Sequence, residues 1–594
     1  MIEAFRSTWA VVHLAWEIDR RLTAIYCFLE VALPLGVFAF ALGLKALSDG
    51  ASRHDHRLAL IGGCVLAVVA AGMVVHMVMY QVEGVTIQEK IGMMADRRIV
   101  ELATSIPVLD KHEEIEFQSE LQLLRDARLT ISLGLEVSFG VALTAMQFLG
   151  IAVLLARLQP LLLSLPVFAL PSLWASRAES RCQEESRKAA AQDTRLARRV
   201  LELATSSAAG KEVRLYGLTH ELLERHKVLS DRANSVQEIA ERKGAIFAII
   251  GWTVFALGFI GAVGLVVVQS LRGLATVGDV LMTIVLANQV STVTARTVWV
   301  SRNYARLLLA GRRMRWLASI AADLKGERTQ RSVVPSSLHS GIRIESLGFR
   351  YPETERWALR DVSVNLRPGS VVAVVGENGA GKSTLVNLLC GLYRPTEGRI
   401  LVDSVDLERF DDRDWRDRVG VGYQDSCQFE FHLRESIGVG HLPLIEDRRA
   451  IWKSVEVVGG VKMVNRLADG LETQLGAAWP MGVDLSGGQW QTVALGRTMM
   501  RPHPLLTIFD EPTTALDPHA EHALFEQIAR AARNDQGRDR ITILISHRFS
   551  TVRAADTIIV LDGGRLVEIG SHDELIEQAG LYAQLHKMQA AAYR

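Results

Sequence analysis

A glycine-rich stretch at residues 376–384, GENGAGKST, combines residue types that suit phosphate binding. It follows the apolar run 371–375 and leads into a helical pattern, which is the strand, loop and helix context that such a motif requires. The glycines let backbone N–H groups close on a β-phosphate, Lys382 reaches the β- and γ-phosphates, and the Ser383 hydroxyl can bind Mg²⁺. An ordinary glycine-rich turn is the alternative, and the context favours the nucleotide site. The candidate nucleotide-binding residues here are Gly376, Asn378, Gly379, Gly381, Lys382, Ser383 and Thr384.

Polar side chains directly follow two later apolar runs in the sequence. Residues 505–509 are followed by Asp510 and Glu511, and residues 541–546 are followed by His547. Ligands gather at the carboxyl ends of parallel strands, so we expect these side chains to face the phosphates. Asp510 suits the Mg²⁺ shell, and Glu511 suits a base or an orienter of the attacking water. Each residue alone fits an ordinary strand end or a core histidine. Together with the run 371–375, however, these runs make three strands that direct polar groups to one edge, which favours a site.

A second segment, 484–497 with the sequence DLSGGQWQTVALGR, also suits phosphate. Ser486, Gly487 and Gly488 open a helical pattern, so backbone N–H groups and a helix N-terminus face whatever lies in front of them. The segment follows the first loop by about a hundred residues. One polypeptide therefore carries two candidate phosphate sites.

The elements that must position these residues fall into two halves. Four apolar runs, 22–44, 58–80, 131–156 and 245–271, are each long enough to cross about 30 Å of hydrocarbon. The run 158–174 follows the third so closely that we predict a helical hairpin, and residues 277–300 form a sixth, more polar span. From about Gly341, short β-rich runs alternate with helical stretches. We therefore predict an all-α transmembrane domain with six spans, followed by an α/β P-loop NTPase domain.

The domain boundaries follow these changes of pattern. Apolar residues on one helical face predict an interfacial N-terminal helix over 1–20, with a packed tail as the alternative. About twenty residues precede the first span, so we expect no leader-cleaving peptidase domain there. The other predicted parts are the transmembrane domain at 21–304 with long helical extensions into the cytoplasm, the linker at 305–340 and the nucleotide-binding domain at 341–594.

Charge and composition set the orientation and exclude some functions. Lys and Arg concentrate between spans two and three and between spans four and five, which predicts that both termini and the nucleotide-binding domain are cytoplasmic. Lys+Arg and Asp+Glu are both 66, so the net charge is zero, and the absence of a basic stripe argues against nucleic acid as a partner. The five cysteines lack CxxC spacing and indicate neither a disulfide framework nor a zinc site.

The motifs occur in the order of a known family. The stretches GENGAGKST, VGYQD, LSGGQ, LLTIFDEP, TALD and ISHR resemble the nucleotide-binding domain of an ABC transporter. With the six spans before them, they resemble an exporter-type half-transporter of the bacterial peptide, lantibiotic or multidrug kind, over essentially the whole chain. The resemblance implies ATP-driven export of a peptide, lipid-like or drug-like substrate across the bacterial inner membrane, with ATP and Mg²⁺ as cofactors.

The resemblance also assigns residue roles. It implies that Tyr351 in FRYP stacks on adenine, and that Gln424 touches Mg²⁺ and senses the membrane domain. It implies that Asp517 lies at a dimer interface, that His547 holds the γ-phosphate, and that residues 425–500 form a helical subdomain.

The same resemblance accounts for the two phosphate sites. In the family, the LSGGQ motif of a second copy covers the γ-phosphate that the partner's P-loop leaves open. Ser486, Gly487, Gly488 and Gln489 are therefore expected to act in trans. Six spans and one P-loop are half of the family's twelve-span, two-site unit. Because Glu511, His547 and LSGGQ are all intact, we expect a homodimer, with a heterodimer as the alternative.

The sequence departs from the family pattern at two points. Trp490 follows LSGGQ, where a basic or polar residue is more usual in the family. This tryptophan resembles the variant of some bacterial peptide exporters, including lantibiotic exporters. The preceding segment, TQLGAAWPMGVD, lacks the Glu-Arg pair that contacts the membrane domain in many exporters. Residues 210–218, GKEVRLYGL, resemble the second coupling helix of the same bacterial subgroup.

Ionisable residues within spans are costly and mark functional sites by default. Glu30, His76, Glu136 and Arg296 are the four here, and one interpretation places them in a cavity that recruits a cationic or amphipathic substrate. A structural pair of the Glu30 and Arg296 type is the other. The functional alternatives to export are an importer on the same fold and a regulatory membrane ATPase or ATP-gated channel.

Overall fold

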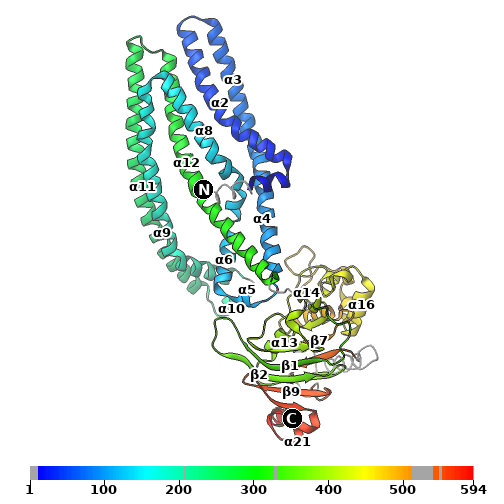
Figure 1. Ribbon diagram of the computed structural model, residues 1–594. Coiled ribbons are helices and arrows are strands. Elements are labelled where there is room, and N and C mark those ends of the chain that lie inside the picture. Colours follow the sequence, from blue (N-terminus) through cyan, green and yellow to red (C-terminus); the bar gives the residue numbers. More distant parts are fainter. Residues whose placement is uncertain (1–10, 207–208, 327–331, 512–538, 547–551, 593–594) are drawn as a thin grey trace. The chain divides into compact units, whose positions relative to one another are not determined.

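A computed structural model describes residues 11–206, 209–326, 332–511, 539–546 and 552–592. Contacts within the chain divide it into two compact units. The first contains Met1–Glu101 and Gln122–Trp316, and the second contains Leu102–Leu121 and Leu317–Arg594. The first unit is helical and the second holds both β-sheets (Figure 1). The predicted fold class is therefore confirmed.

The described part of the chain has six helical segments that are long and apolar enough to cross a membrane, as predicted. A helix satisfies all its backbone hydrogen bonds within one segment, which hydrocarbon requires. The six segments are α2 (Arg20–Ser52), α3 (His56–Met79) with η1 (Tyr80–Gly84) and α4 (Val85–Ser105), α8 (Gly134–Leu158), η2 (Pro160–Ser164) with α9 (Leu165–Thr205), α11 (Thr219–Leu271) and α12 (Val277–Gly326).

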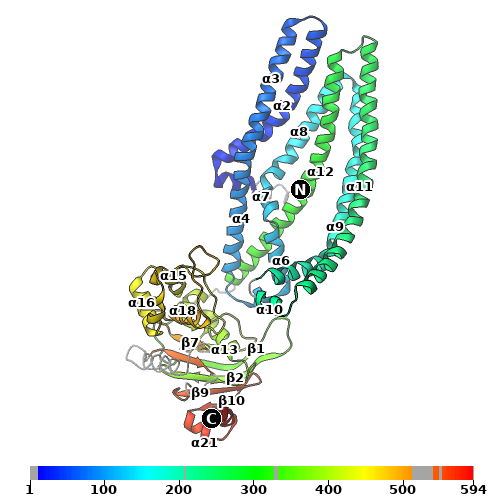
Figure 2. The same cartoon turned by 180° about the vertical axis from the view of Figure 1, so that it is seen from behind.

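Much of the chain between the spans is also helical. Helices α9 and α11 run side by side for most of their length, as Figure 2 shows from behind. Helix α12 continues to Gly326, so residues 305–326 of the predicted linker belong to a helix. The short helices between the spans are α5 (Asp110–Glu113), α6 (Ile115–Asp126), α7 (Arg128–Ser132) and α10 (Gly210–Leu215).

The described part of the N-terminal segment packs against the first unit. Residues 11–18 are helical, and Val12 and Ala15 join an apolar cluster with Leu22 and Tyr26. The Thr23 hydroxyl donates a 2.8 Å hydrogen bond to the Ala15 carbonyl. Residues 1–10 of the predicted interfacial helix lie outside the described residues.

Two sheets form the core of the second unit. One is antiparallel, in the order β2-β1-β4-β5, and the other has the order β10-β9-β3-β8-β7-β6, with only β10 antiparallel to its neighbour. Every residue of β3 and β8 is buried, which explains their unbroken runs of apolar residues. The strands are β1 (Ile342–Arg350), β2 (Trp357–Leu366), β3 (Val371–Val375), β4 (Glu397–Val402), β5 (Val405–Asp406), β6 (Val419–Gly422), β7 (Leu506–Asp510), β8 (Ile541–Ile545), β9 (Thr557–Asp562) and β10 (Arg565–Gly570).

Helices cover the sheets and form a smaller subdomain. The described helices are α13 (Lys382–Leu389), α14 (Asp412–Arg416), α15 (Leu433–Gly438), α16 (Arg448–Val457), α17 (Val461–Arg466), α18 (Gly487–Met499), α21 (His572–Glu577) and α22 (Leu581–Ala592). Helices α15 to α18 share an apolar cluster that includes Leu433, Ile451 and Trp490. Burial in this cluster accounts for the unusual tryptophan after LSGGQ.

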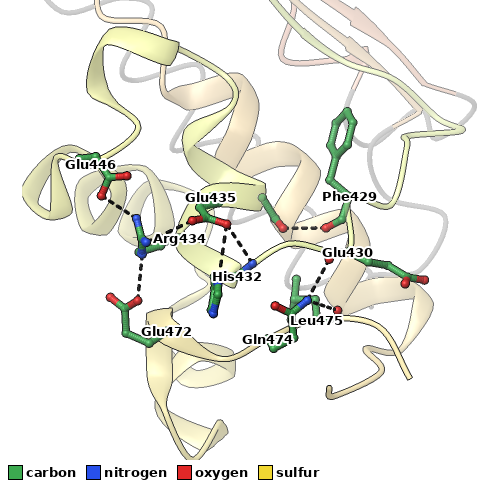
Figure 3. A network of polar contacts seen from close by, with 10 residues as sticks. Phe429, Glu430, His432, Arg434, Glu435, Glu446, Glu472, Gln474 and Leu475 are labelled. Carbon is green, nitrogen blue, oxygen red and sulfur yellow. Dashed lines mark hydrogen bonds and ion pairs between the residues drawn. The ribbon is translucent and has the colours of Figure 1, made fainter. Parts of the chain in front are cut away.

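A polar network holds the loops of this subdomain together (Figure 3). The Arg434 guanidinium donates to Glu472 at 2.8 Å, to Glu446 at 2.6 Å and to Glu435 at 3.1 Å. Close by, the Gln474 amide donates to the carbonyls of Glu430 and Leu475, both at 2.9 Å. These contacts tie α15 to the segment that leads into α18.

Candidate functional site

The glycine-rich loop between β3 and α13 has a backbone that only glycine tolerates at two points. A Cβ on Gly376, where φ is +158°, would lie 2.2 Å from the Leu561 carbonyl oxygen. A Cβ on Gly381, where φ is +102°, would lie 2.6 Å from Leu359 Cδ2. The loop is therefore held close to its neighbours, in a conformation that turns backbone N–H groups into an anion cradle.

Lys382 lies inside this loop. Its side chain is only 7% exposed, and its ammonium donates to the carbonyls of Gly376 at 2.9 Å and Glu377 at 3.0 Å. Burial lowers the pKa of Lys382, while the carboxylates of Glu511 and Asp510 act in the opposite direction. A phosphate in the cradle would supply the negative charge that favours the charged ammonium.

Strand β7 ends at Asp510, and Glu511 follows it directly. Asp510 is 5% exposed, and burial raises its pKa, against the hydrogen bond donated by the Ser383 hydroxyl. Glu511 has a left-handed backbone with φ of +46°, and its N–H donates to the Ile545 carbonyl at 3.0 Å. A strained backbone at a strand end is typical of functional positions. The Glu511 carbonyl accepts a 3.3 Å hydrogen bond from Gln491 on α18, so the LSGGQ helix is linked to this strand end.

A cavity of about 490 Å³ collects most of the residues predicted for the nucleotide site. Tyr351, Gln424 and Glu511 line it together with the loop. The phenol of Tyr351 and the Thr384 hydroxyl share a 3.0 Å hydrogen bond. The loop residues that line it are Asn378, Gly379, Gly381, Lys382, Ser383 and Thr384.

Sequence reasoning missed Arg356 and Trp357, which also line this cavity. Arg356 is the last residue of the turn between β1 and β2, and Trp357 begins β2. The Arg350 guanidinium lies 4.4 Å from the centroid of the Trp357 ring. Only their position in the sequence, just after Tyr351, could have indicated that they lie near the site. A residue pattern alone does not indicate that this turn reaches the phosphate loop.

The oxygen donors of the site suit Mg²⁺. The Ser383 hydroxyl and the Asp510 carboxylate are hydrogen-bonded to each other, and the Gln424 side chain lines the same cavity as Ser383. Mg²⁺ prefers oxygen ligands and is usually shared between one or two protein groups and nucleotide phosphates. The residues present therefore fit this ion. Among the described residues, no cluster of three or more His, Cys, Asp or Glu side chains suits another metal.

The LSGGQ segment begins helix α18 with a capping box. The Ser486 hydroxyl accepts from the Gln489 N–H at 3.4 Å, and the Gln489 side chain accepts from the Ser486 N–H at 2.8 Å. Ser486 and Gly487 are exposed, and a Cβ on Gly487 would meet nothing within 4 Å. Residues 486–489 are not among the residues that line the cavity of their own chain. His547 and Asp517 lie outside the described residues.

In the first unit, the structure brings Glu30 and Arg296 together. The Glu30 side chain, 6% exposed, accepts from the Arg296 guanidinium at 2.8 Å and from the Tyr26 hydroxyl at 3.0 Å. Glu136 accepts from Gln88 at 3.4 Å, and the His76 ring lies 6.1 Å from the Tyr80 ring. On the sixth, more polar span, Asn288 and Thr292 are exposed. This arrangement matches the structural interpretation of Glu30 and Arg296.

Comparisons with known proteins agree with this geometry. Residues 359–514 match the family described as ABC transporter. An ATP-dependent lipid A-core flippase of Aromatoleum aromaticum is 31% identical over 435 residues, which cover 72% of this chain and 68% of that one. The flippase of Chromohalobacter salexigens is 36% identical over 258 residues, 43% of each chain. The subtilin transport ATP-binding protein SpaT of Bacillus subtilis is 34% identical over 269 residues, 45% of this chain and 43% of that one.

One solved structure shares the fold over nearly the whole chain. It is a bacterial Atm1-family ABC exporter with ATP bound, with a TM-score of 0.76 and 24% sequence identity. The match covers 96% of this chain and 98% of that chain. The chain matches less than half of the Chromohalobacter flippase and less than half of SpaT. The similarity over both units is therefore seen with the Aromatoleum flippase and with this structure.

Proposed function

Because this chain belongs to the ABC transporter family, we propose that it is an ATP-driven exporter in the bacterial inner membrane. Its substrate would be a peptide, lipid-like or drug-like molecule moved out of the cytoplasm. One observation carries the proposal: a buried lysine, a phosphate loop and a strand-end acidic pair share one site, in a chain with six candidate membrane spans. The nucleotide-binding domain and both termini would then be cytoplasmic.

The chain's own groups account for nucleotide binding and hydrolysis. Backbone N–H groups of the loop bind the phosphates, and Lys382 neutralises charge on the β- and γ-phosphates. Glu511 accepts a proton from, or orients, the attacking water. Mg²⁺, held by Ser383, Gln424 and Asp510, would neutralise phosphate charge. Tyr351 lines the same cavity, where it would stack on the adenine.

The exposed LSGGQ segment completes the site from a second copy. Ser486, Gly487, Gly488 and Gln489 present a helix N-terminus that does not line the nucleotide cavity formed by the described residues of their own chain. In a symmetric dimer, each such N-terminus would face the phosphate loop of the partner. ATP binding would close the two nucleotide-binding domains on each other, and hydrolysis would let them separate.

Replacing Glu511 with Gln tests the hydrolytic role. We expect ATPase activity to fall by at least about a hundredfold, because a positioned general base contributes about 10²- to 10⁴-fold. ATP binding should persist, since the loop and Lys382 are untouched. The measurement is phosphate release together with retained radiolabelled ATP, and Glu577→Gln, an exposed carboxylate on α21, is the matched control.

Transport direction needs its own measurement. Inside-out vesicles that contain the purified protein should accumulate labelled peptide or lipid-like substrates only when ATP is present. Uptake in right-side-out vesicles instead would indicate an importer. Active ATPase with no movement of any tested substrate would contradict export and support a regulatory role.

A further inference from the structure

Residues 102–121, between the second and third spans, are built into the C-terminal unit. The Leu109 N–H donates to the Leu392 carbonyl at 2.8 Å. The Arg416 guanidinium bridges two segments by donating to the carbonyls of Pro107 and Gly391. Ile106, Val108 and Phe117 are buried. The segment begins within helix α4, which ends at Ser105, so it is continuous in the chain with the second candidate span.

Tyr393 joins this segment to the interior of the nucleotide-binding domain. Its hydroxyl donates to the Glu113 carboxylate at the end of α5, and the residue is 4% exposed. Its ring packs at 5.3 Å from Phe349 and at 5.5 Å from Tyr351, while Phe349 and Tyr351 lie 5.0 Å apart. All three pairs are edge-on, the geometry in which aromatic rings attract each other. A change in one ring therefore displaces the others.

The cluster of the Phe349, Tyr351 and Tyr393 rings reaches the nucleotide cavity through Tyr351. Tyr351 lines it, and the Tyr351 phenol and the Thr384 hydroxyl share a 3.0 Å hydrogen bond. Thr384 lies at the start of α13, is 6% exposed and belongs to the phosphate loop motif. An unbroken path of contacts thus runs from Thr384 through Tyr351 and Tyr393 to Glu113.

This path makes the cluster responsive to nucleotide. A phosphate oxygen at the start of α13 is a stronger partner for the Thr384 hydroxyl than a phenol, because hydrogen bonds to charged acceptors are about twice as strong. Tyr351 would then give up its hydrogen bond and reorient against the base. Since Tyr393 packs on Tyr351, its hydroxyl and the Glu113 contact shift with it.

We propose that Tyr393 is a positioning residue that links nucleotide binding at Thr384 to the seating of residues 102–121 in the same chain. The proposal rests on the proposed function, because it requires nucleotide in this cavity. By linkage, a contact that changes on nucleotide binding also changes nucleotide affinity when it is removed. A purely structural Tyr393 would contribute to folding but would leave the nucleotide response of residues 102–121 intact.

Hydrogen exchange of the full-length protein in lipid nanodiscs, with and without MgADP, tests this link. In the wild type, we expect MgADP to change the exchange rate of residues 102–121 by at least about threefold. Tyr393→Phe keeps the ring and removes the hydroxyl, and Glu113→Ala removes the acceptor from the exposed side. Both should abolish the response, and the double variant should change MgADP affinity no more than either single variant.

Tyr582→Phe is the matched control. Its hydroxyl is also buried and bonded, to His572 at 2.8 Å, but it lies between the C-terminal helices. This variant should keep the wild-type response. A normal response in Tyr393→Phe or Glu113→Ala would overturn the link, as would MgADP binding to the wild type without any response. Failure of the wild type to bind MgADP would overturn the proposed function and this inference together.

Discussion

Single residues decide whether charge can be buried in the first unit. Glu30 is almost fully buried, yet its two oxygens are both engaged, one by the Tyr26 hydroxyl and the other by Arg296. A buried ion pair stabilises a protein little more than well-packed apolar residues of similar size would. Each charge in the pair nevertheless needs the other to compensate for its loss of water. Removing one leaves a buried charge without compensation.

Breaking this pair from one side should therefore destabilise the protein more than removing both charges. Glu30→Gln and Arg296→Met are each expected to lower stability by about 3 kcal/mol, because a lone buried charge remains or a charged hydrogen bond is lost. The combined variant should lose less than the sum of the two, with a coupling above about 1 kcal/mol. Thermal unfolding of the purified protein in detergent gives the comparison. Additive effects would show that the two side chains stabilise the helices independently.

At the scale of elements, the hairpin of α2 and α3 depends on close backbone approach. A Cβ on Gly62 would lie 2.4 Å from the Leu47 nitrogen, and a Cβ on Gly50 would lie 2.3 Å from the Ala59 nitrogen. Small residues at such crossings let membrane helices pack, since the hydrophobic effect does not drive them together in lipid. Asp55 caps α3 by accepting from the N–H groups of Arg57 and Leu58.

Gly62→Ala should push the two helices of this hairpin apart. Overpacking costs about 1–3 kcal/mol, which we expect to appear as a lower unfolding temperature of the detergent-solubilised protein. Gly72→Ala on the same helix is the control, because its Cβ would meet nothing within 4 Å. Both variants gain the same helix propensity, so only packing separates them. Equal unfolding temperatures for the two variants would contradict the close approach.

At the scale of the whole molecule, the proposal requires each ATP site to be shared between two copies. Only the N-terminal end of the LSGGQ helix is exposed, at Ser486 and Gly487, whereas most of the rest of the helix is buried. The phosphate loop and Glu511 line a cavity to which residues 486–489 do not contribute. If each site is shared in this way, a dimer with one substituted phosphate loop and one substituted LSGGQ segment keeps an intact site only when the two substitutions are in different copies.

Mixed dimers isolated through two affinity tags test this sharing, with Glu511→Gln in every chain so that bound ATP is retained. One dimer combines a Lys382→Ala copy with a Ser486→Arg copy. If each site takes its LSGGQ segment from the partner, the normal loop of the second copy meets the normal LSGGQ segment of the first. This dimer should then have one intact site and retain about one ATP. The other combines a doubly substituted copy with an otherwise normal one, and it should retain none. The opposite pattern would show that each chain completes its own site.

Much of this protein follows from local sequence patterns. Apolar runs of more than twenty residues specify membrane helices, because hydrocarbon leaves the backbone no other partners. The glycine-rich loop after a buried strand, and the acidic pair after another, specify the phosphate site, because parallel strands end at one edge. These features depend on short stretches of chain, so the fold class and the residues Lys382, Ser383, Asp510 and Glu511 could be predicted without a structure.

Tertiary structure alone decided which distant residues meet. The pairing of Glu30 with Arg296 joins residues 266 positions apart, and the sequence also allowed a substrate cavity at these residues. Residues 102–121 read as part of the membrane domain, yet they pack with the nucleotide-binding domain through Leu392 and Tyr393. The physical reason is that such contacts depend on how whole helices and sheets pack, and no local periodicity records which surfaces finally come together.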